Sequence, residues 1–409
     1  MIAISLAPNL ELSDTLLALK LMFQPWRWRK GMANGRLVAK LREVLGKEEI
    51  YTINSARWGL SVLLQNLHLE DNTEVLLQAF TCVSVPGPVV WNNLKPIYVD
   101  ILEKELTMDP ADLEKKISSR SRVVIIQHTF GMPARMDEIM AIAQKHNLVV
   151  IEDCAHTIGG KYHERLLGTI GDASIYSFGR DKAISSVFGG AILINNSKIF
   201  SNIKNTLEEL PTNGRGWIIQ QLLHPILFQF VIKPLYFVAQ IGKIKLVISQ
   251  KLGLISKAIA RSEKSGKRPS FVCAKLSNAL AELAFHQLSR VDIFNSRRRE
   301  IVEMYKAGFG NMRGLPNLDA NSIPYLLRYP VLVNKPKQIL LNARAQHMLL
   351  GDWYEVIAPK DTNLEAVLYV NGSCRVAEAV AKRIINLPIY YKLKNREVWH
   401  IVEFIKNNV

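Results

Sequence analysis

Lys182 is a candidate for covalent chemistry because it lies in a loop between two short apolar runs, in "SIYSFGRDKAISSVFGGAILINN" (174–196). The glycine pair Gly189-Gly190 follows it, and both flanking runs have the composition of buried strands. A lysine in such a loop can be an ordinary exposed turn residue. It can also present its amine to an aldehyde at the edge of a sheet, where the amine acts as a nucleophile.

Two further candidates are found next to predicted strands. Asp153 follows the apolar run "LVVI" after one residue, Glu152, in "IEDCAH", and a buried carboxylate at a strand end is costly unless it serves a cation. The stretch "TINSARWGL" (52–60) is a small polar turn that leads into a helix, whose N–H groups can hold a phosphate. A structural cap or ion pair is the alternative for Asp153, and an ordinary capped helix start is the alternative for 52–60.

A phosphorylated pyridine-ring aldehyde would use these residues together. Its aldehyde needs an amine, which Lys182 supplies as a Schiff base, and its protonated ring nitrogen needs a carboxylate such as Asp153. Its phosphate needs a helix N-terminus and a hydroxyl, and Ser177 lies shortly before Lys182. The chain order of phosphate helix, aspartate, serine and lysine is therefore chemically coherent.

Short apolar runs between residues 50 and 200 must position these side chains. They alternate with amphipathic helical segments such as 109–119 and 135–147. This alternation predicts an α/β fold with a mainly parallel sheet flanked by helices, in which ligands bind at the carboxyl ends of the strands. The predicted strands are 74–80, 95–101, 121–129, 148–154, 173–178 and 190–195.

The chain divides into four predicted parts. Residues 1–49 form an N-terminal helical segment, 50–210 a large cofactor-binding α/β domain, 211–270 a basic, apolar helical insertion, and 271–409 a small C-terminal α+β domain. In the last part we expect one long helical stretch at 274–309, a strand at 325–334, and helices at 337–348, 374–385 and 395–407.

The composition is that of an ordinary globular protein with an excess of positive charge. Of 409 residues, 48% are hydrophobic and 22% charged, and the formal net charge is +16. The four cysteines lie far apart without metal-ligand spacing, which predicts reduced thiols and no metal site. The N-terminus lacks a basic start followed by an apolar core, so we expect no secretory signal and a cytoplasmic protein.

The insertion at 211–270 carries much of the charge, with ten Lys or Arg side chains against one acidic side chain. Its longest uncharged run, 217–232, is about 16 residues, short of the roughly 20 that span a bilayer. Apolar helices that also carry basic residues predict an interfacial hairpin, at the inner face of the cytoplasmic membrane. The alternative is an insertion packed on the main body or at a dimer interface. No nucleic-acid recognition module is visible, so we expect no nucleic-acid partner.

Three short sequences within residues 125–190 carry a family resemblance. "QHTFGMP" matches a strand-His-x-x-Gly-x-Pro element, "EDCAH" matches "EDAA[QH]", and "SFGRDK" matches "SFxxxK". All three elements belong to the DegT-type (DegT/DnrJ/StrS) sugar aminotransferases, pyridoxal-phosphate (PLP) enzymes that the chain resembles over most of 50–200 and 271–409. The resemblance implies a fold-type I PLP-dependent transferase, with a fold like that of aspartate aminotransferase.

The resemblance implies a role for each matched residue. Asp153 would face the pyridine nitrogen, His156 would lie against the ring or its 3-oxygen, Ser177 would bind the phosphate, and Lys182 would form the Schiff base. An amino donor, commonly glutamate in this family, would charge the cofactor, which then aminates a keto sugar attached to a nucleotide. The freed Lys182 amine would move the proton between the substrate carbon and the cofactor carbon. A second subunit completes the pocket in this fold, so we expect a homodimer.

The chain departs from the family at several positions. Ala56-Arg57 replaces the Gly-Thr phosphate turn, and Cys82 replaces the aromatic residue that stacks on the ring. We keep Ala56, Arg57 and Cys82 in the cofactor-binding set, because arginine can bind phosphate bidentately and the thiol keeps a soft contact. Phe188 replaces a glutamate, Cys273 replaces the asparagine of the partner-subunit "NYR" segment, and Ser277-Asn278 replaces "S[ED]".

The sequence thus predicts a PLP-dependent aminotransferase that acts on a nucleotide- or carrier-linked keto sugar in polysaccharide or glycan biosynthesis. The changes at Arg57, Cys82 and Cys273 leave one alternative open, a catalytically weak PLP-binding regulatory or scaffold protein of the same fold, associated with a membrane. Sugar dehydration or deoxygenation, for which family members carry histidine in place of the lysine, is disfavoured by Lys182.

Overall fold

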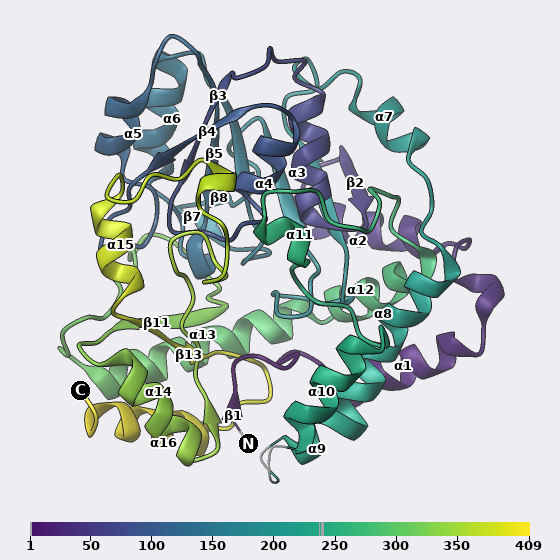
Figure 1. The fold of residues 1–409 in the computed structure, drawn as a ribbon, viewed down its shortest axis with the longest axis vertical. Coiled ribbons are helices and arrows are strands. Elements are labelled where there is room, and N and C mark those ends of the chain that lie inside the picture. Colours follow the sequence, from purple (N-terminus) through teal and green to yellow (C-terminus); the bar gives the residue numbers. More distant parts are fainter. Residues whose placement is uncertain (1, 237, 239–240) are drawn as a thin grey trace.

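Seven strands form the central sheet of the computed structural model, which describes residues 2–236, 238 and 241–409. Each of the six predicted strands is present, and one further strand, β2, lies at an edge (Figure 1). From one edge to the other, the strands are β2 (Ile50–Ile53), β10 (Gly190–Ile194), β9 (Ala173–Ser177), β6 (Val149–Asp153), β5 (Ser121–Gln127), β3 (Glu74–Gln78) and β4 (Lys95–Val99).

The sheet is mostly parallel, and β10 is the strand that runs against its neighbours. β4, β3, β5, β6 and β9 pair in parallel, whereas β10 pairs antiparallel with both β9 and β2. Residues 178–189 join β9 to β10 without a crossover helix, and such a direct connection requires antiparallel pairing. The loop that contains Lys182 is therefore the turn of a β-hairpin.

Helices cover both faces of the sheet, so the domain has three layers (Figure 1). Val123 and Ile125 of β5 pack on one face with α3 (Ala56–Gln65) and α4 (Pro86–Trp91). Val124 and Ile126 pack on the other face with α5 (Pro110–Lys116) and α6 (Met136–Lys145). Alternate side chains of a strand point to opposite faces, and both sets are apolar here because neither face meets water.

A second core joins the β2–β10 end of the sheet to helices from distant parts of the chain. Leu37 of α2 (Ala33–Leu45) and Leu280 of α12 (Asn278–Leu288) pack there with Leu193 of β10. The same core includes α1 (Leu12–Met22), which packs along α8 (Arg215–Leu227) of the insertion. The N-terminal helices are thus part of the large domain's core.

The C-terminal part is built on the antiparallel pair β11 (Arg328–Leu332) and β13 (Ile384–Pro388). The helices of this part are α13 (Val291–Phe309), α14 (Pro336–Ala345), α15 (Arg375–Ala381) and α16 (Asn395–Lys406). The remaining short elements of the chain are β1 (Ile2–Ala3), which pairs in parallel with β12 (Met348–Leu349), β7 (Lys161–Tyr162), β8 (Arg165–Leu166), α7 (Ile203–Glu209), η1 (Pro25–Arg27), η2 (Thr129–Gly131) and η4 (Glu365–Val367).

Two predictions for this part were wrong in detail. The helical stretch expected at 274–309 is two helices, α12 and α13, because the chain turns at Arg290, whose side chain pairs with two acidic residues at the start of α1. The helix expected at 374–385 ends early, and Ile384 and Ile385 belong to β13. Two consecutive β-branched residues favour a strand, and here β11 provides the partner.

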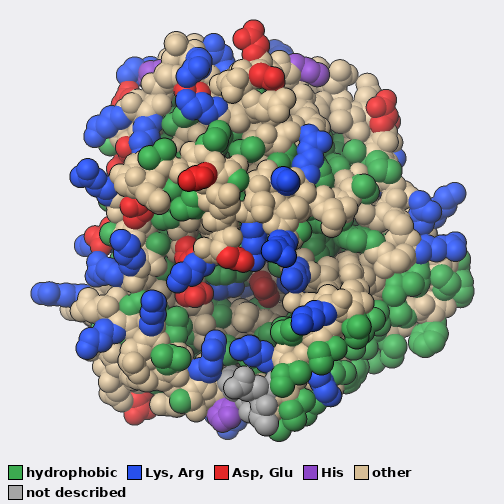
Figure 2. Space-filling model, viewed as in Figure 1, with side chains coloured by type: hydrophobic (Ala, Val, Ile, Leu, Met, Phe, Trp, Pro, Cys, Tyr) green, Lys and Arg blue, Asp and Glu red, His purple; other side chains and the backbone are tan. Residues whose placement is uncertain are grey.

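The insertion forms a helical hairpin. Its helices are α8 (Arg215–Leu227), η3 (Phe228–Ile232), α9 (Lys233–Leu235), α10 (Ile241–Lys251) and α11 (Arg261–Lys264). By length and composition the continuous helix Arg215–Leu235 is able to cross a membrane, although the uncharged run in the sequence is shorter. Figure 2 shows apolar side chains gathered at the lower right, where α1, α8 and α10 lie.

Candidate active site

The carboxyl ends of β6 and β9 and the β9–β10 loop open onto one cavity. It encloses about 1020 Å³, including the solvent-filled space at its mouth. The cavity is lined by all seven residues that the sequence analysis assigned to catalysis or cofactor binding: Ala56, Arg57, Cys82, Asp153, His156, Ser177 and Lys182. The fold therefore brings the predicted site together at the edge of the sheet where ligands of α/β proteins bind.

Asp153 ends β6 and is 4% exposed. Its Oδ1 accepts a 2.9 Å hydrogen bond from the Ala155 N–H, the one bond that the described residues give this carboxylate. Burial raises the pKa of the Asp153 carboxyl, and the Ala155 bond and the charge of Lys182 offset part of that rise. A buried carboxylate with a single donor is stabilised by a cation placed in the cavity before it.

Lys182 is half-buried in the hairpin loop, and its Nζ lies 5.7 Å from the centroid of the Trp353 ring. Burial lowers the pKa of the Lys182 amine below its ordinary value, Cys82 and Asp153 oppose this shift, and the nearby Arg328 adds to it. A lower pKa increases the fraction of neutral amine, which is the form that attacks an aldehyde.

His156 is held as a neutral, flat wall of the cavity. Its Nδ1 accepts a 3.1 Å hydrogen bond from the Phe130 N–H, so the proton is on Nε2, which lies 2.7 Å from the Tyr354 hydroxyl. Burial holds the pKa of His156 well below its usual value, with further lowering from Lys182. The imidazole lies nearly parallel to the rings of Phe130 and Tyr354, 5.9 and 5.6 Å away.

The other end of the cavity has the features of a phosphate site. α3 begins there, with the Ser55 side chain accepting a hydrogen bond from the Trp58 N–H. The N–H groups of Ala56 and the following residue have no acceptor inside the helix. Gly190 lies so close that a Cβ on it would be 2.7 Å from the Ala56 nitrogen, and Gly190 pairs with Ser177 across the hairpin. A helix N-terminus and a hydroxyl therefore meet at this point.

Arg57 is the predicted residue whose surroundings differ most from the expectation. Its guanidinium forms an ion pair with Glu263 of α11 and donates a 2.8 Å hydrogen bond to the Ala258 carbonyl. The Arg57 and Glu263 side chains are 12% and 1% exposed. Arg57 thus holds the insertion against the cavity, and its contact with a phosphate stays a prediction.

The other departures lie in different surroundings. Cys82 lines the cavity, as does Phe188, whose ring packs edge-on against Trp217 of the insertion and against Phe271. The Phe188 substitution therefore belongs to the contact between the cavity wall and the insertion. Cys273 does not line the cavity, and burial raises the pKa of its thiol to about 12.

Sequence reasoning missed several residues of the cavity wall. Trp353 and Tyr354 come from the C-terminal part, Ala258 and Ile259 from the insertion, and Arg180 from the lysine loop itself. Arg180 lies at a variable position of the "SFGRDK" motif, and no motif surrounds the other four, of which only the aromatic pair at 353–354 offered a signal. They were missed because tertiary packing alone brings these loops to the strand ends.

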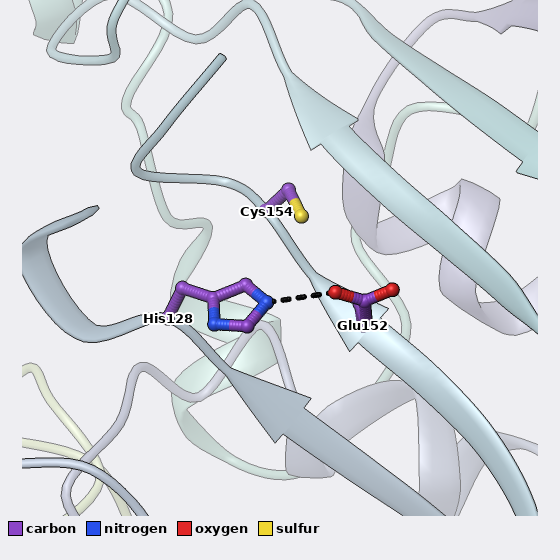
Figure 3. A group of neighbouring side chains, drawn as sticks. All are labelled: His128, Glu152 and Cys154. Carbon is purple, nitrogen blue, oxygen red and sulfur yellow. Dashed lines mark hydrogen bonds and ion pairs between the residues drawn. The ribbon is translucent and has the colours of Figure 1, made fainter. Parts of the chain in front are cut away.

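Glu152 precedes Asp153 on β6, so the pleat directs the two side chains to opposite faces of the strand. Figure 3 shows Glu152 beside His128 and Cys154. Glu152 lies 3.0 Å from Nε2 of His128 and accepts three backbone N–H bonds from the turn 168–171. Burial raises its pKa, but these bonds outweigh burial and hold the pKa of Glu152 below its usual value. Cys154 lies nearby, and burial raises its thiol pKa. We assign no metal to this trio, because the hydrogen bonds already occupy the carboxylate.

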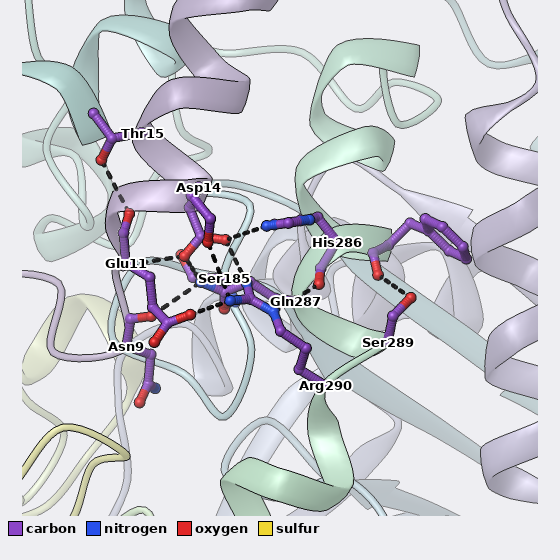
Figure 4. A network of polar contacts seen from close by, with 11 residues as sticks. Asn9, Glu11, Asp14, Thr15, Ser185, His286, Gln287, Ser289 and Arg290 are labelled. Atoms are coloured by element: carbon purple, nitrogen blue, oxygen red, sulfur yellow. Dashed lines mark hydrogen bonds and ion pairs between the residues drawn. The ribbon is translucent and has the colours of Figure 1, made fainter.

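The lysine loop is also held from the N-terminal side (Figure 4). Asn9 donates a 2.7 Å hydrogen bond to the Lys182 carbonyl. Gln287 of α12 donates to the Asn9 carbonyl, and its own side-chain oxygen accepts from the Ser185 N–H. Arg290 pairs with the two acidic residues that begin α1. The backbone of the loop is thus fixed while the Lys182 amine faces the cavity.

These residues fit pyridoxal phosphate. At one end, a buried carboxylate that accepts a single hydrogen bond faces the cavity, and a half-buried amine lies on the adjacent loop. At the other end, a helix N-terminus and a hydroxyl lie beside a glycine that leaves room for a phosphate. Asp153, Lys182, Ser177 and Ala56 would therefore hold the ring nitrogen, the aldehyde and the phosphate.

Similarity to known proteins agrees with this fit. A sequence profile of the DegT/DnrJ/EryC1/StrS aminotransferase family matches residues 13–215 and 255–406. The chain belongs to this family. This DegT-family protein is therefore an aminotransferase, and PLP is its cofactor. Residues 216–254, between the two matched segments, hold most of the helical hairpin.

Individual relatives extend the similarity over most of the DegT-family chain. A UDP-N-acetyl-3-dehydro-α-D-glucosamine 3-aminotransferase from Acidithiobacillus ferrooxidans is 33% identical over 351 residues, 86% of this chain and 81% of the relative. GDP-perosamine synthase from Escherichia coli O157:H7 is 24% identical, covering 93% and 91%. The structure of Helicobacter pylori PseC, an aminotransferase of pseudaminic acid biosynthesis, aligns with a TM-score of 0.75 at 19% identity, covering 98% and 97%.

We expect Glu152→Gln to lower the free energy of unfolding by about 1 to 3 kcal/mol at pH 7. One of the buried backbone N–H groups that donate to Glu152 would then lose its charged acceptor. The folded-state pKa of Glu152 lies below its ordinary value of 4.5, so the carboxylate stabilises the fold above that pH and this stabilisation is lost as the pH falls. Denaturant unfolding should therefore show a smaller difference from the wild-type protein at pH 3 than at pH 7.

Glu303→Gln is the matched control, since the Glu303 side chain is 69% exposed and should contribute less than about 0.5 kcal/mol. A Glu152→Gln protein as stable as the wild type at pH 7 would contradict the structural role of this carboxylate.

The Arg57–Glu263 pair predicts a coupled loss of stability. Arg57→Met and Glu263→Gln should each cost about 1 to 3 kcal/mol, because each leaves a buried charge without its partner. The double variant should lose less than the sum of the two, as a double-mutant cycle of unfolding measures.

Cofactor affinity then separates the two roles of Arg57. If Arg57 also binds the phosphate, Arg57→Met should weaken PLP binding and Glu263→Gln should not. Additive losses of stability would show that the pair does not hold the insertion in place.

Proposed function

We propose that this aminotransferase transfers an amino group, from glutamate, to a keto sugar carried on a nucleotide or another carrier, in polysaccharide or glycan biosynthesis. The observation that carries the proposal is the cavity in which Asp153 and Lys182 meet, beside a phosphate-type helix N-terminus. The names of the relatives support the substrate class, since the A. ferrooxidans relative acts on a UDP-linked 3-dehydro sugar and the E. coli relative makes a GDP-linked amino sugar.

PLP, when bound, supplies the aldehyde that takes up the amino group and the ring that withdraws electrons from the substrate carbon. Asp153 would stabilise a positive charge at the ring nitrogen, because its carboxylate is buried and accepts a hydrogen bond from the Ala155 N–H alone among the described residues. His156 keeps its place through the Tyr354 hydroxyl, and being neutral it adds no charge that would compete with Asp153.

The Lys182 amine then serves as acid and base. Burial lowers the pKa of Lys182, so Nζ gives up its proton more readily than an exposed lysine does, and its place beside Asp153 keeps it at the reacting end of the cavity. Trp353 and Tyr354 form the wall over the amine and exclude water from it. The bonds from Asn9 and Gln287 hold the loop backbone, so the motion is confined to the lysine side chain.

Spectroscopy and mass spectrometry test the reaction directly. The wild-type protein with PLP should be yellow, should lose that colour when glutamate is added, and should regain it with an accepted keto-sugar nucleotide from a panel. Borohydride should leave a cofactor adduct on Lys182. Lys182→Ala should lose the adduct and about 10²-fold or more of the activity, whereas Lys251→Ala, on the outer surface of the insertion, should keep both.

A bound cofactor that no amino donor discharges would contradict transamination. That result would favour the regulatory or scaffold protein of the same fold.

We also propose that the protein works as a homodimer. Trp26, Met32 and Val272 are apolar and each is at least 56% exposed. In the sequence, Trp26 and Met32 lie on either side of Arg29, whose side chain donates a hydrogen bond to Thr212. Thr212 in turn forms a β-bridge with Lys275, three residues after Val272. A cluster of exposed apolar side chains supports a protein interface at this place.

Light scattering should give a mass of twice 46.2 kDa for the purified protein. Met32→Asp should shift the mass toward that of one chain, because the interface would bury a charge, and Leu341→Asp, at an exposed site elsewhere, should not. A single-chain mass for the active wild-type protein would contradict the dimer.

A further inference from the structure

α1 exposes an apolar stripe to the surroundings of the protein. Leu12, Leu16, Leu19 and Phe23 follow one another at intervals of three or four residues and are between 38% and 74% exposed. The opposite side of the helix is the buried one and includes Ala18 and Leu21. A helix at a water-facing surface normally has the reverse arrangement, with polar residues outside.

α10 exposes a second apolar stripe. Ile244, Val247, Ile248 and Leu252 are between 45% and 68% exposed. The helix is pressed against the preceding turn at Gly242, where a Cβ would be 2.5 Å from the Ile232 carbonyl oxygen. This close approach fixes which side of α10 faces the protein, and its aliphatic side chains are left outside.

The two stripes belong to one surface. α1 packs along α8, and α10 folds back on η3 and α9, so both helices pack against the one continuous helix Arg215–Leu235. Phe230 of η3 is 53% exposed and lies in the connection between α8 and α9. Figure 2 shows apolar side chains gathered over this corner of the molecule, with Lys and Arg side chains among them. We call the exposed apolar residues of 12–23, Phe230 and the exposed apolar residues of 244–252 the α1–α10 face.

The charge around the α1–α10 face is positive. From Pro211 to Ser262 the sequence contains no Asp or Glu, while Lys243, Lys245 and Lys251 lie on α10 itself. The acidic residues at the start of α1 are paired with Arg290. An apolar surface surrounded by cations is complementary to the headgroups and acyl chains of an anionic membrane.

We propose that the α1–α10 face docks on the surface of a bilayer that contains anionic phospholipid, the inner face of the cytoplasmic membrane. A second copy of the chain is a poorer partner, because two such faces would bring like charges together. The docking is interfacial, since the helix Arg215–Leu235 gives Ile218, Leu222 and Ile232 to the protein core and cannot present them to lipid.

Docking would place the active-site cavity close to the membrane. Residues 252–260 follow α10 directly, and Ala258 and Ile259 of this segment line the cavity. Arg180, from the lysine loop, donates hydrogen bonds to Ser256 in the same segment. The chain from the α1–α10 face to the cavity wall is therefore short, and Arg180 holds it at Ser256.

Co-sedimentation with vesicles tests the proposal without any enzymatic assay, so its failure is distinct from failure of the proposed function. Full-length protein should sediment with phosphatidylcholine vesicles that contain phosphatidylglycerol, and much less with phosphatidylcholine alone or at 0.5 M salt, because salt screens the lysines. The triple variant Phe23→Ser, Ile244→Ser, Leu252→Ser should bind about tenfold or more weakly, since it loses three apolar anchors.

The matched control is Ile293→Ser, Leu341→Ser, Val370→Ser, which removes three side chains that are at least 55% exposed on other surfaces. It should bind vesicles like the wild type, and thermal unfolding should show both triple variants to be folded. Equal vesicle binding by wild type and the α1–α10 variant would overturn the proposal. The proposal would also be overturned if the wild-type protein did not bind vesicles and the α1–α10 variant lost the self-association of the wild type. That result would make the face an interface between copies of the chain.

Discussion

The antiparallel pairing of β9 with β10 is the constraint on which the active site depends. It returns the chain to the same edge of the sheet without a crossover helix, so residues 178–189 must form a loop at the carboxyl ends of the parallel strands. Ser177 enters that loop, Gly190 leaves it opposite Ser177, and Lys182 lies between them, next to the end of β6 with Asp153. A parallel β10 would need a long crossover and would carry the lysine away from the carboxylate.

Two adjacent carboxylates on β6 show how one strand serves structure and chemistry at once. Glu152 is surrounded by donors that hold its pKa down, whereas Asp153 has a single donor and a pKa that burial raises. The pleat directs them to opposite sides of the strand. The first binds the turn 168–171 to the sheet, and the second leaves its charge unsatisfied toward the cavity. A cation bound in the cavity would thus offset the energetic cost of burying Asp153, while Glu152 helps to keep the strand in place.

The insertion connects the cavity to the outer surface of the molecule. Glu263 pairs with Arg57 at the phosphate end, Ala258 and Ile259 form part of the wall, and α10 carries the exposed apolar stripe. The family profile does not extend over 216–254, yet α8 of this segment shares a core with α1 and α12. The insertion therefore forms part of the cavity wall and part of the exposed apolar surface. A structural change at that surface can alter the cavity wall.

Local chemistry allowed the sequence alone to predict the strands, the ordered residues Asp153, Ser177 and Lys182, and the cofactor that they suit, because covalent catalysis demands particular side chains in a particular order, and the family resemblance added His156. It could not identify Trp353 and Tyr354, which reach the cavity from a distant loop. It also placed one helix across Arg290, where ion pairs with α1 turn the chain. The pattern of α1 and α10 reveals amphipathic helices, but only packing decided that their aliphatic stripes face outward, since which side of a helix is buried depends on the neighbours that the fold provides.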